Sequence, residues 1–158
     1  MLAFACAAAP AAAPPYALAG REAPDFALRA AAGPTLRLSE HRGEVVVLSF
    51  WGSHCGPCGA QLAALNRSLK TYESAGLTVL GVGVDDDAAR SKEFATAQPV
   101  TFPLLLDPKK AVARLYRVDN LPMTLLIDRG GTVRFVHRDY DSKSDALYLD
   151  ELRKLLNE

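Results

Sequence analysis

Residues 45–58 read VVVLSFWGSHCGPC, and this stretch decides the fold. A run of β-branched and aromatic residues leads directly into two cysteines that are separated by Gly56 and Pro57. Such an unbroken apolar run is typical of a central strand that is buried on both faces. After the cysteines, apolar residues recur at helical spacing at Leu62, Leu65, Leu69 and Tyr72. The stretch therefore predicts a strand that ends at the cysteine pair and a helix that begins there.

The remaining chain predicts further strands in alternation with helices. The expected strands are a hairpin of 26–29 and 35–38 around Gly33-Pro34, then 77–84, 102–107, 121–128 and 132–140. The expected helices are 88–97, capped by the aspartates at 85–87, a helix that starts at Asp107-Pro108, and a closing helix capped by Ser144. This order predicts an α/β fold with a parallel sheet, to which the last two strands add an antiparallel edge.

Composition excludes several classes of protein. The chain has 158 residues, 49% of them apolar, which suits one soluble domain, and we place that domain at residues 21–158. Lys plus Arg equals Asp plus Glu at 18 each, so the charge balance gives no support for a nucleic-acid partner. After residue 20 no apolar run is long enough to span a membrane.

The first 20 residues are Ala/Pro-rich and uncharged, and we exclude them from the fold as a disordered leader. They resemble the tail of a bacterial export signal, so we expect an exported protein of the periplasm or cell envelope. Residues 3–6 also resemble a lipoprotein cleavage site ahead of Cys6. Cys6 is then either lipid-anchored or an ordinary cysteine of the leader.

The pair Cys55 and Cys58 allows three interpretations. Structural zinc needs four ligands, and the three histidines, His41, His54 and His137, are too scattered to complete a site, so we expect no metal. A disulfide that closes so short a loop removes little chain entropy, which argues against a structural staple. Redox chemistry remains, with a Cys55–Cys58 disulfide in place of any separate cofactor.

The position of the pair assigns a role to each cysteine. At a strand end Cys55 would be exposed, whereas Cys58 would face inward from the first helical turn. The positive end of the helix dipole favours a thiolate at this place, and Pro57 is tolerated at the helix start and stiffens the loop. We therefore expect Cys55 to attack a substrate disulfide and Cys58 to resolve the mixed disulfide.

Three segments, 45–58, 102–107 and 120–135, carry a family resemblance. Residues 22–157 resemble the thioredoxin-fold TlpA/ResA-like thiol–disulfide oxidoreductases, which are related to the AhpC/TSA redoxins. The resemblance implies a central mixed sheet flanked by helices, an N-terminal hairpin and an inserted strand–helix segment. It also implies that Pro122 is cis and faces the cysteines, and that the backbone at Leu121 pairs with substrate.

The same resemblance implies the partners of the protein. These are thiols or disulfides of other proteins and a thiol-donor reductase of the membrane that recharges the site. We expect a monomer. Cytochrome c maturation is one role of this branch.

Three neighbours of the cysteines depart from the family pattern. Ser49 stands where thioredoxin has a buried Asp, His54 where Trp is usual, and Gln61 where the branch often has Glu. Loss of that Glu puts the cytochrome c role in doubt. His54 is either an imidazolium that stabilises the Cys55 thiolate or a neutral loop residue. Trp51 either packs in the core or covers the disulfide and limits its exposure to solvent.

Two other functions stay open at the level of sequence. The pair could switch a binding surface without turnover, as a redox sensor does. A thiol peroxidase would follow the peroxiredoxin pattern Pro-x-x-x-Thr/Ser-x-x-Cys, but this chain has Leu48 and Gly52 at those places. The sequence gives no direction of electron flow.

Overall fold

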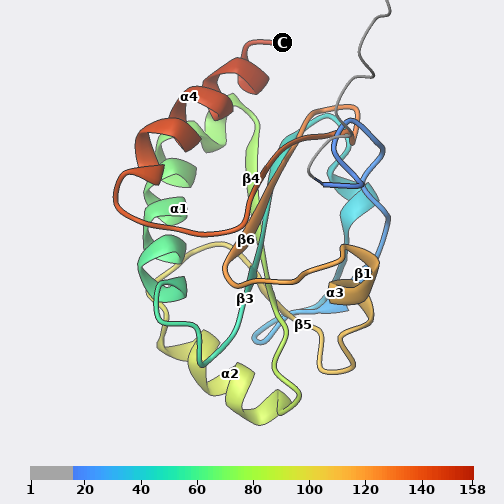
Figure 1. Ribbon diagram of the computed structural model, residues 1–158, viewed down its shortest axis with the longest axis vertical. Helices are drawn as coiled ribbons and strands as arrows, with labels where there is room; N and C mark the ends of the chain where they lie inside the picture. The colour runs from blue at the N-terminus through green and yellow to red at the C-terminus, as the bar shows by residue number, and fades with distance from the viewer. Residues whose placement is uncertain (1–15) are drawn as a thin grey trace, which may run out of the picture.

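The apolar run ahead of the cysteines is the central strand of the structure, a computed structural model that describes residues 16–158. This strand, β3 (Val45–Trp51), is buried at every residue. It pairs in parallel with β4 (Leu77–Gly83) and antiparallel with β6 (Met123–Ile127). The outer strands are β5 (Leu104–Leu106) and β7 (Val133–His137), which gives the order β5-β4-β3-β6-β7 (Figure 1). The predicted mixed sheet with an antiparallel edge is confirmed.

Alternate residues of β3 face two separate cores. Val45, Val47 and Trp51 pack in one core against α1 (Cys58–Tyr72), α2 (Ala88–Ala97) and α4 (Ser144–Leu156). Val46, Leu48 and Phe50 pack in the other against the N-terminal segment and α3 (Ala111–Leu115). Figure 1 shows these two layers on opposite sides of the sheet. Burial of both faces explains why β3 carries so few polar residues.

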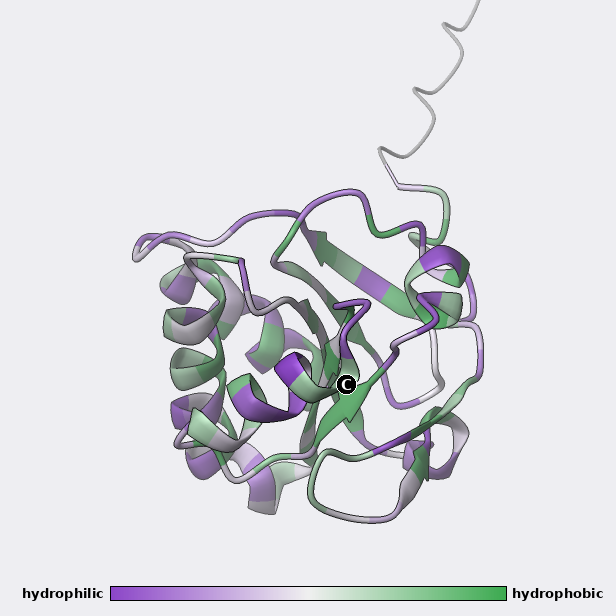
Figure 2. Cartoon of the chain, turned by 90° about the horizontal axis from the view of Figure 1, so that it is seen from below, coloured by the Kyte–Doolittle hydropathy of each residue, from purple (hydrophilic) through white to green (hydrophobic). Residues whose placement is uncertain are grey.

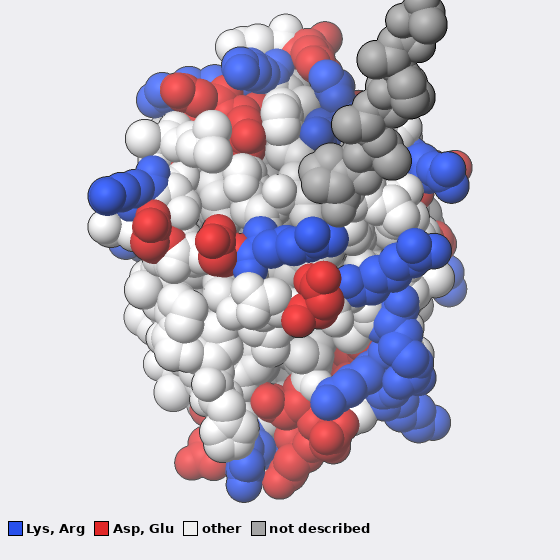
Figure 3. Space-filling view, in the orientation of Figure 1, with Lys and Arg blue, Asp and Glu red and all other residues white. Residues whose placement is uncertain are grey.

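Hydropathy follows this layered arrangement. In Figure 2 the strands of the sheet are largely green, whereas the helices carry purple segments toward solvent. Figure 3 shows both acidic and basic side chains on the face seen in Figure 1, with basic ones gathered at the lower right and acidic ones at the bottom.

The N-terminal part of the domain begins earlier than we predicted. The hairpin of β1 (Ala27–Arg29) and β2 (Thr35–Arg37) is confirmed and leads into a 3-10 turn at Leu38–His41. However, Tyr16 is only 3% exposed, and its hydroxyl donates to the Tyr116 carbonyl at 2.5 Å. The folded domain therefore includes residues 16–20, which the composition had assigned to the leader. Cys6 lies outside the described residues.

The helix α3 starts later than the sequence predicts. Pro108 is not in its first turn, because Lys110 adopts a left-handed conformation (φ 54°) and the helix begins at Ala111. The buried Asp107 carboxylate instead accepts a hydrogen bond from the Ala113 N–H at 2.8 Å. The side chain of Asp107 thus ties strand β5 to the helix across the intervening turn.

The ends of the other helices can be compared with the predicted caps. Ser144 is the first residue of α4 and not its N-cap, which is Lys143, and the Asp141 carboxylate accepts from the Lys143 and Ser144 N–H groups at 2.8 and 3.1 Å. A 3-10 turn at Glu73–Ala75 follows α1 and ends at Gly76 in the left-handed conformation, as expected for a C-cap. Asp87 caps α2 by accepting from the Ala89 N–H, as predicted.

Residues 16–158 contain neither a membrane-spanning helix nor a cluster of metal ligands. No helix in this part of the chain is both long and apolar enough to cross a membrane. Over the same residues, no three His, Cys, Asp or Glu side chains gather in a way that could hold a metal ion.

Gly83 gives a test of the packing that supports the end of β3. A Cβ atom at Gly83 would lie 2.6 Å from the buried Trp51 ring, so we expect Gly83→Ala to lower the free energy of unfolding by about 1–3 kcal/mol. Gly33→Ala is the control, since its Cβ would meet Ala30 at an ordinary 3.6 Å. Urea denaturation measures both variants, and equal stability of the two would contradict this account.

Candidate active site

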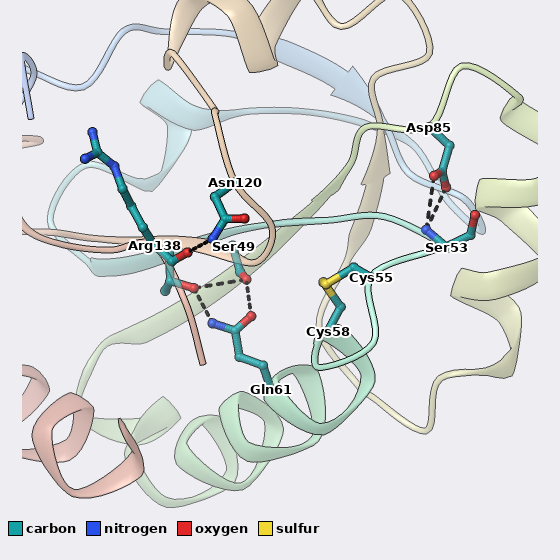
Figure 4. Close-up of a disulfide and its surroundings, with 9 residues drawn as sticks. Ser49, Ser53, Cys55, Cys58, Gln61, Asp85, Asn120 and Arg138 are labelled. Carbon is teal, nitrogen blue, oxygen red and sulfur yellow. Dashed lines mark hydrogen bonds between the residues drawn. A yellow bond between two sulfur atoms is a disulfide. The ribbon is translucent and has the colours of Figure 1, made fainter. Parts of the chain in front are cut away.

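The two cysteines form a disulfide at the junction of β3 and α1 (Figure 4). Cys58 is the first residue of α1 and is fully buried, whereas Cys55 lies in the preceding loop and is half-buried. The partial exposure of Cys55 and the inward position of Cys58 are those expected from the sequence. This arrangement leaves one sulfur accessible to a partner and holds the other in the core.

The start of α1 places positive electrostatic potential at the disulfide. Pro57 occupies the N-cap, no side chain caps the helix, and its first turn contains no acidic residue. The helix dipole at Cys58 is therefore not offset by a local carboxylate. A thiolate of Cys55, the accessible cysteine at this end of the helix, is stabilised.

A groove of about 460 Å³ runs beside Cys55 and contains two further predicted residues, His54 and Leu121. The Leu121 side chain lies close to Gly52, where an added Cβ would be 3.0 Å from Leu121 Cδ1. The remaining lining combines apolar and polar side chains of Val84, Asp85, Lys110, Ala113, Val118, Asp119 and Asn120. Such a mixed groove can hold an extended chain whose disulfide reaches Cys55.

Pro122 borders the same end of the sheet. The Leu121–Pro122 peptide bond is cis, as the family resemblance implied, and Pro122 is buried. The next residue, Met123, pairs with Phe50 in β3, so the antiparallel register brings Pro122 beside Trp51. The loop that contains Pro122 is thereby placed next to the loop that contains Cys55.

Asp85 holds the cysteine loop in place, a role that the sequence did not predict. The Ser53 N–H donates to both carboxylate oxygens of Asp85 at 3.1 and 3.0 Å, and the Ser91 hydroxyl donates to one of them at 2.8 Å (Figure 4). A signal for this contact was present, since Asp85 closely follows β4 and parallel strands end at the same edge of a sheet.

His54 is exposed and bound to a residue of α2. Its Nε2 lies 2.8 Å from Arg90 Nη1. A guanidinium can only donate, so Nε2 accepts and carries no proton in this arrangement. The contact holds the Arg90 guanidinium beside the cysteine loop. No sequence signal pointed to Arg90.

Trp51 belongs to the core. The side chain is fully buried and stacks on Phe94 of α2 with ring centroids 5.0 Å apart. Its indole N–H has no hydrogen-bond partner among residues 16–158. Trp51 and Cys58 share one hydrophobic cluster, so the indole supports the inner side of the site.

Three polar side chains lie buried behind the disulfide. The Ser49 hydroxyl donates to Gln61 Oε1 at 3.1 Å and lies 3.3 Å from the Thr124 hydroxyl, to which Gln61 Nε2 also donates. Ser49 and Thr124 are direct partners in the register of β3 and β6. Thr124 was missed, although a lone polar residue in each of two apolar strands was a visible signal.

Tyr148 of α4 extends this set. Its hydroxyl donates to the Asp139 carbonyl at 3.2 Å. Burial raises the pKa of Tyr148 to about 12, and the neighbouring polar side chains of Thr124 and Gln61 act in the opposite direction. The phenol is thus neutral throughout the physiological range.

Comparison with known sequences shows close relatives. The AhpC/TSA family model matches residues 19–136. The thiol-disulfide oxidoreductase ResA of Geobacillus kaustophilus is 36% identical over 126 residues, which cover 80% of this chain and 72% of that protein. ResA of Bacillus subtilis is 33% identical over 114 residues, or 72% of this chain and 64% of that protein.

Solved structures of similar proteins have the same fold as this chain. A crystal structure from Chlorobium tepidum, described as a thiol:disulfide interchange protein DsbE, matches with a TM-score of 0.84 at 33% identity over 87% of this chain and 97% of that chain. The exposed lipoprotein thioredoxin Etrx1 of Streptococcus pneumoniae matches with a TM-score of 0.73 at 28% identity, over 84% and 100%. The predicted thioredoxin-like fold is confirmed.

Asp85 provides a test of how the cysteine loop is held. Asp85→Ala leaves the Ser53 N–H without its acceptor, so we expect that amide to exchange with solvent faster and the free energy of unfolding to fall by about 1–3 kcal/mol. Hydrogen exchange followed by NMR measures the first effect. Asp86→Ala, at an exposed ion pair with Lys110, is the control, and equal exchange in both variants would show that Asp85 does not hold the loop.

Proposed function

Because the chain belongs to the AhpC/TSA family and is a thiol–disulfide oxidoreductase, we propose that it exchanges disulfides with exported proteins through Cys55 and Cys58. The observation that carries this proposal is the disulfide itself. One sulfur is half-buried beside a groove, and the other is fully buried at an uncapped helix start. A structural disulfide would have no need of such a groove.

In the reducing direction the site works in two steps. The Cys55 thiolate attacks one sulfur of the substrate disulfide, and the other substrate sulfur leaves with the electron pair. Cys58 then loses its proton and attacks Cys55, which releases the second substrate sulfur and leaves Cys55–Cys58 oxidised. A thiol donor of the membrane would return two electrons to the pair, which completes the cycle.

The groove residues have supporting roles in this proposal. The backbone at Leu121, ahead of the cis Pro122, would pair with the substrate chain, since both lie at the edge where Cys55 is accessible. His54 lines the groove at that edge, and its partner Arg90 adds a positive charge there. Pro57 fixes the first turn of α1, and Trp51 packs beneath it.

We place this activity in the cell envelope. The export-like leader supports that location, and the structurally similar Etrx1 of Streptococcus pneumoniae is described as an exposed lipoprotein. A lipid at Cys6 and a monomeric state belong to the same proposal. We favour other exported proteins over c-type cytochromes as substrates, because Gln61 stands where the family members with that role often have Glu.

Turnover of a protein disulfide tests the proposal. In an insulin-reduction assay with dithiothreitol we expect Cys55→Ser to lose all turnover, and Cys58→Ser to accumulate a mixed disulfide with substrate because the resolving thiol is gone. Intact-mass spectrometry identifies that adduct. Cys6→Ser, which removes the third cysteine, is the control and keeps full turnover; activity that survives in Cys55→Ser would refute the assignment.

A further inference from the structure

A set of four uncharged polar side chains fills the core behind Cys58, and we refer to Ser49, Gln61, Thr124 and Tyr148 as the polar network. Their exposed fractions are 0% for the first three and 4% for Tyr148. Buried polar groups cost stability unless they are hydrogen-bonded. Here Ser49, Gln61 and Thr124 bond to one another, and Tyr148 donates to the Asp139 carbonyl. Apolar residues of the same shape could fill this space without loss of stability, so the network calls for a functional explanation.

The polar network lies on the same side of the sheet as Cys58. Gln61 follows Cys58 by three residues in α1, so both side chains lie on the same face of the helix. Ser49 precedes Trp51 by two residues in β3, which puts both on the face of the sheet that α1 covers. In Figure 4 the Gln61 side chain points from α1 toward Ser49, next to the disulfide.

No member of the polar network carries a charge at neutral pH. Two are hydroxyls, one is an amide, and the Tyr148 phenol has a pKa raised to about 12 by burial. No carboxylate or imidazole hydrogen-bonds with any of the four among residues 16–158. Among residues 16–158, the four side chains of the polar network therefore include no group that takes up a proton in the physiological range.

Titratable groups approach from neighbouring elements, and two of them, Glu151 and Asp139, act on the Tyr148 phenol through their charge. Glu151 of α4 and His137 of β7 bond to each other at 2.5 Å, and the His137 ring is tilted against the Tyr148 ring with centroids 4.3 Å apart. The side chain of His137 is only 14% exposed. Asp85 bonds to the cysteine loop, and His54 bonds to Arg90 of α2.

We propose that the polar network makes Gln61 a positioning residue that keeps the surroundings of Cys58 uncharged, so that the proton of the resolving thiol leaves to solvent rather than to a protein side chain. This inference rests on the proposed function, since it concerns the second of its two steps. It assigns a role to the buried amide and hydroxyls that the exchange chemistry at Cys55 does not require.

The resolving step then balances as follows. The Cys58 S–H gives its proton to a base supplied by solvent, and the sulfur lone pair forms a bond to Cys55. The bond between Cys55 and the substrate sulfur breaks, and the electron pair leaves on the substrate sulfur, which takes a proton from water. The substrate disulfide has gained two electrons over both steps, and the cysteine pair has lost two.

The pH dependence of the second step tests this proposal. When the reduced full chain reacts with dithiobis(nitrobenzoate) in a stopped-flow instrument, attack by Cys55 and release by Cys58 give two separate phases of absorbance. We expect the rate of release to rise about tenfold for each pH unit from pH 5 to 8, in step with the thiolate fraction and without an inflection. An inflection in that range that persists in His54→Ala overturns the proposal, whereas one that disappears there comes from the exposed loop and supports it.

Gln61→Glu supplies the missing base and gives the complementary test. Ser49 already donates to Gln61 Oε1, so a carboxylate can accept the same bond. We expect an inflection below pH 8 and release at least about tenfold faster at pH 6. Asn66→Asp is the matched control, because it adds a carboxylate to the same helix where Asn66 only accepts hydrogen bonds, from Thr101. If Gln61→Glu folds and its release rate depends on pH as in the wild-type protein, the proposal is overturned. If the variant does not fold, the pH dependence of release in the wild-type protein decides the question.

The two proposals fail in different ways. Release of the chromophore depends only on the cysteine pair and needs no protein substrate. Loss of insulin turnover with a normal release phase would contradict the proposed function alone, and an inflected release phase with normal turnover would contradict only the role of the polar network.

Discussion

Burial of β3 on both faces and along both edges is the constraint on which the rest of the structure depends. Because β4 and β6 cover its edges and two cores cover its faces, the strand has one fixed direction and one fixed end. The chain can leave the sheet only after Trp51, and it turns directly into α1. The short loop between these rigid elements has room for one sulfur at the surface and one in the core.

The resulting site has two halves with different electrostatics. The outer half faces the groove, where Arg90, His54 and Asp85 present charged and polar groups next to Cys55. The inner half is uncharged, with Cys58 packed among apolar side chains and backed by the polar network. Desolvation strengthens electrostatic effects inside a protein, so the absence of charge there matters more than it would at the surface.

Sequence reasoning worked best where a residue's role is set by its nearest neighbours in the chain. The order of elements, the buried β3, the hairpin and the Asp87 cap follow from periodicity and local hydrogen bonding, and all are present. Prediction was wrong where distant contacts override local preference. The Asp107 carboxylate reaches Ala113 across a turn and delays α3, and the burial of Tyr16 against Tyr116 extends the domain into the presumed leader.

For the candidate site, the sequence by itself determined the cysteine pair, the strand-to-helix junction that presents it and the unusual residues Ser49, His54 and Gln61. These depend on local pattern and on spacing along one segment. Only the tertiary structure decided what those residues contact: Arg90 for His54, Asp85 for the loop, and Thr124 and Tyr148 for Gln61. The physical reason is that hydrogen-bond partners are selected by distance and orientation between elements far apart in the chain, which no local pattern encodes.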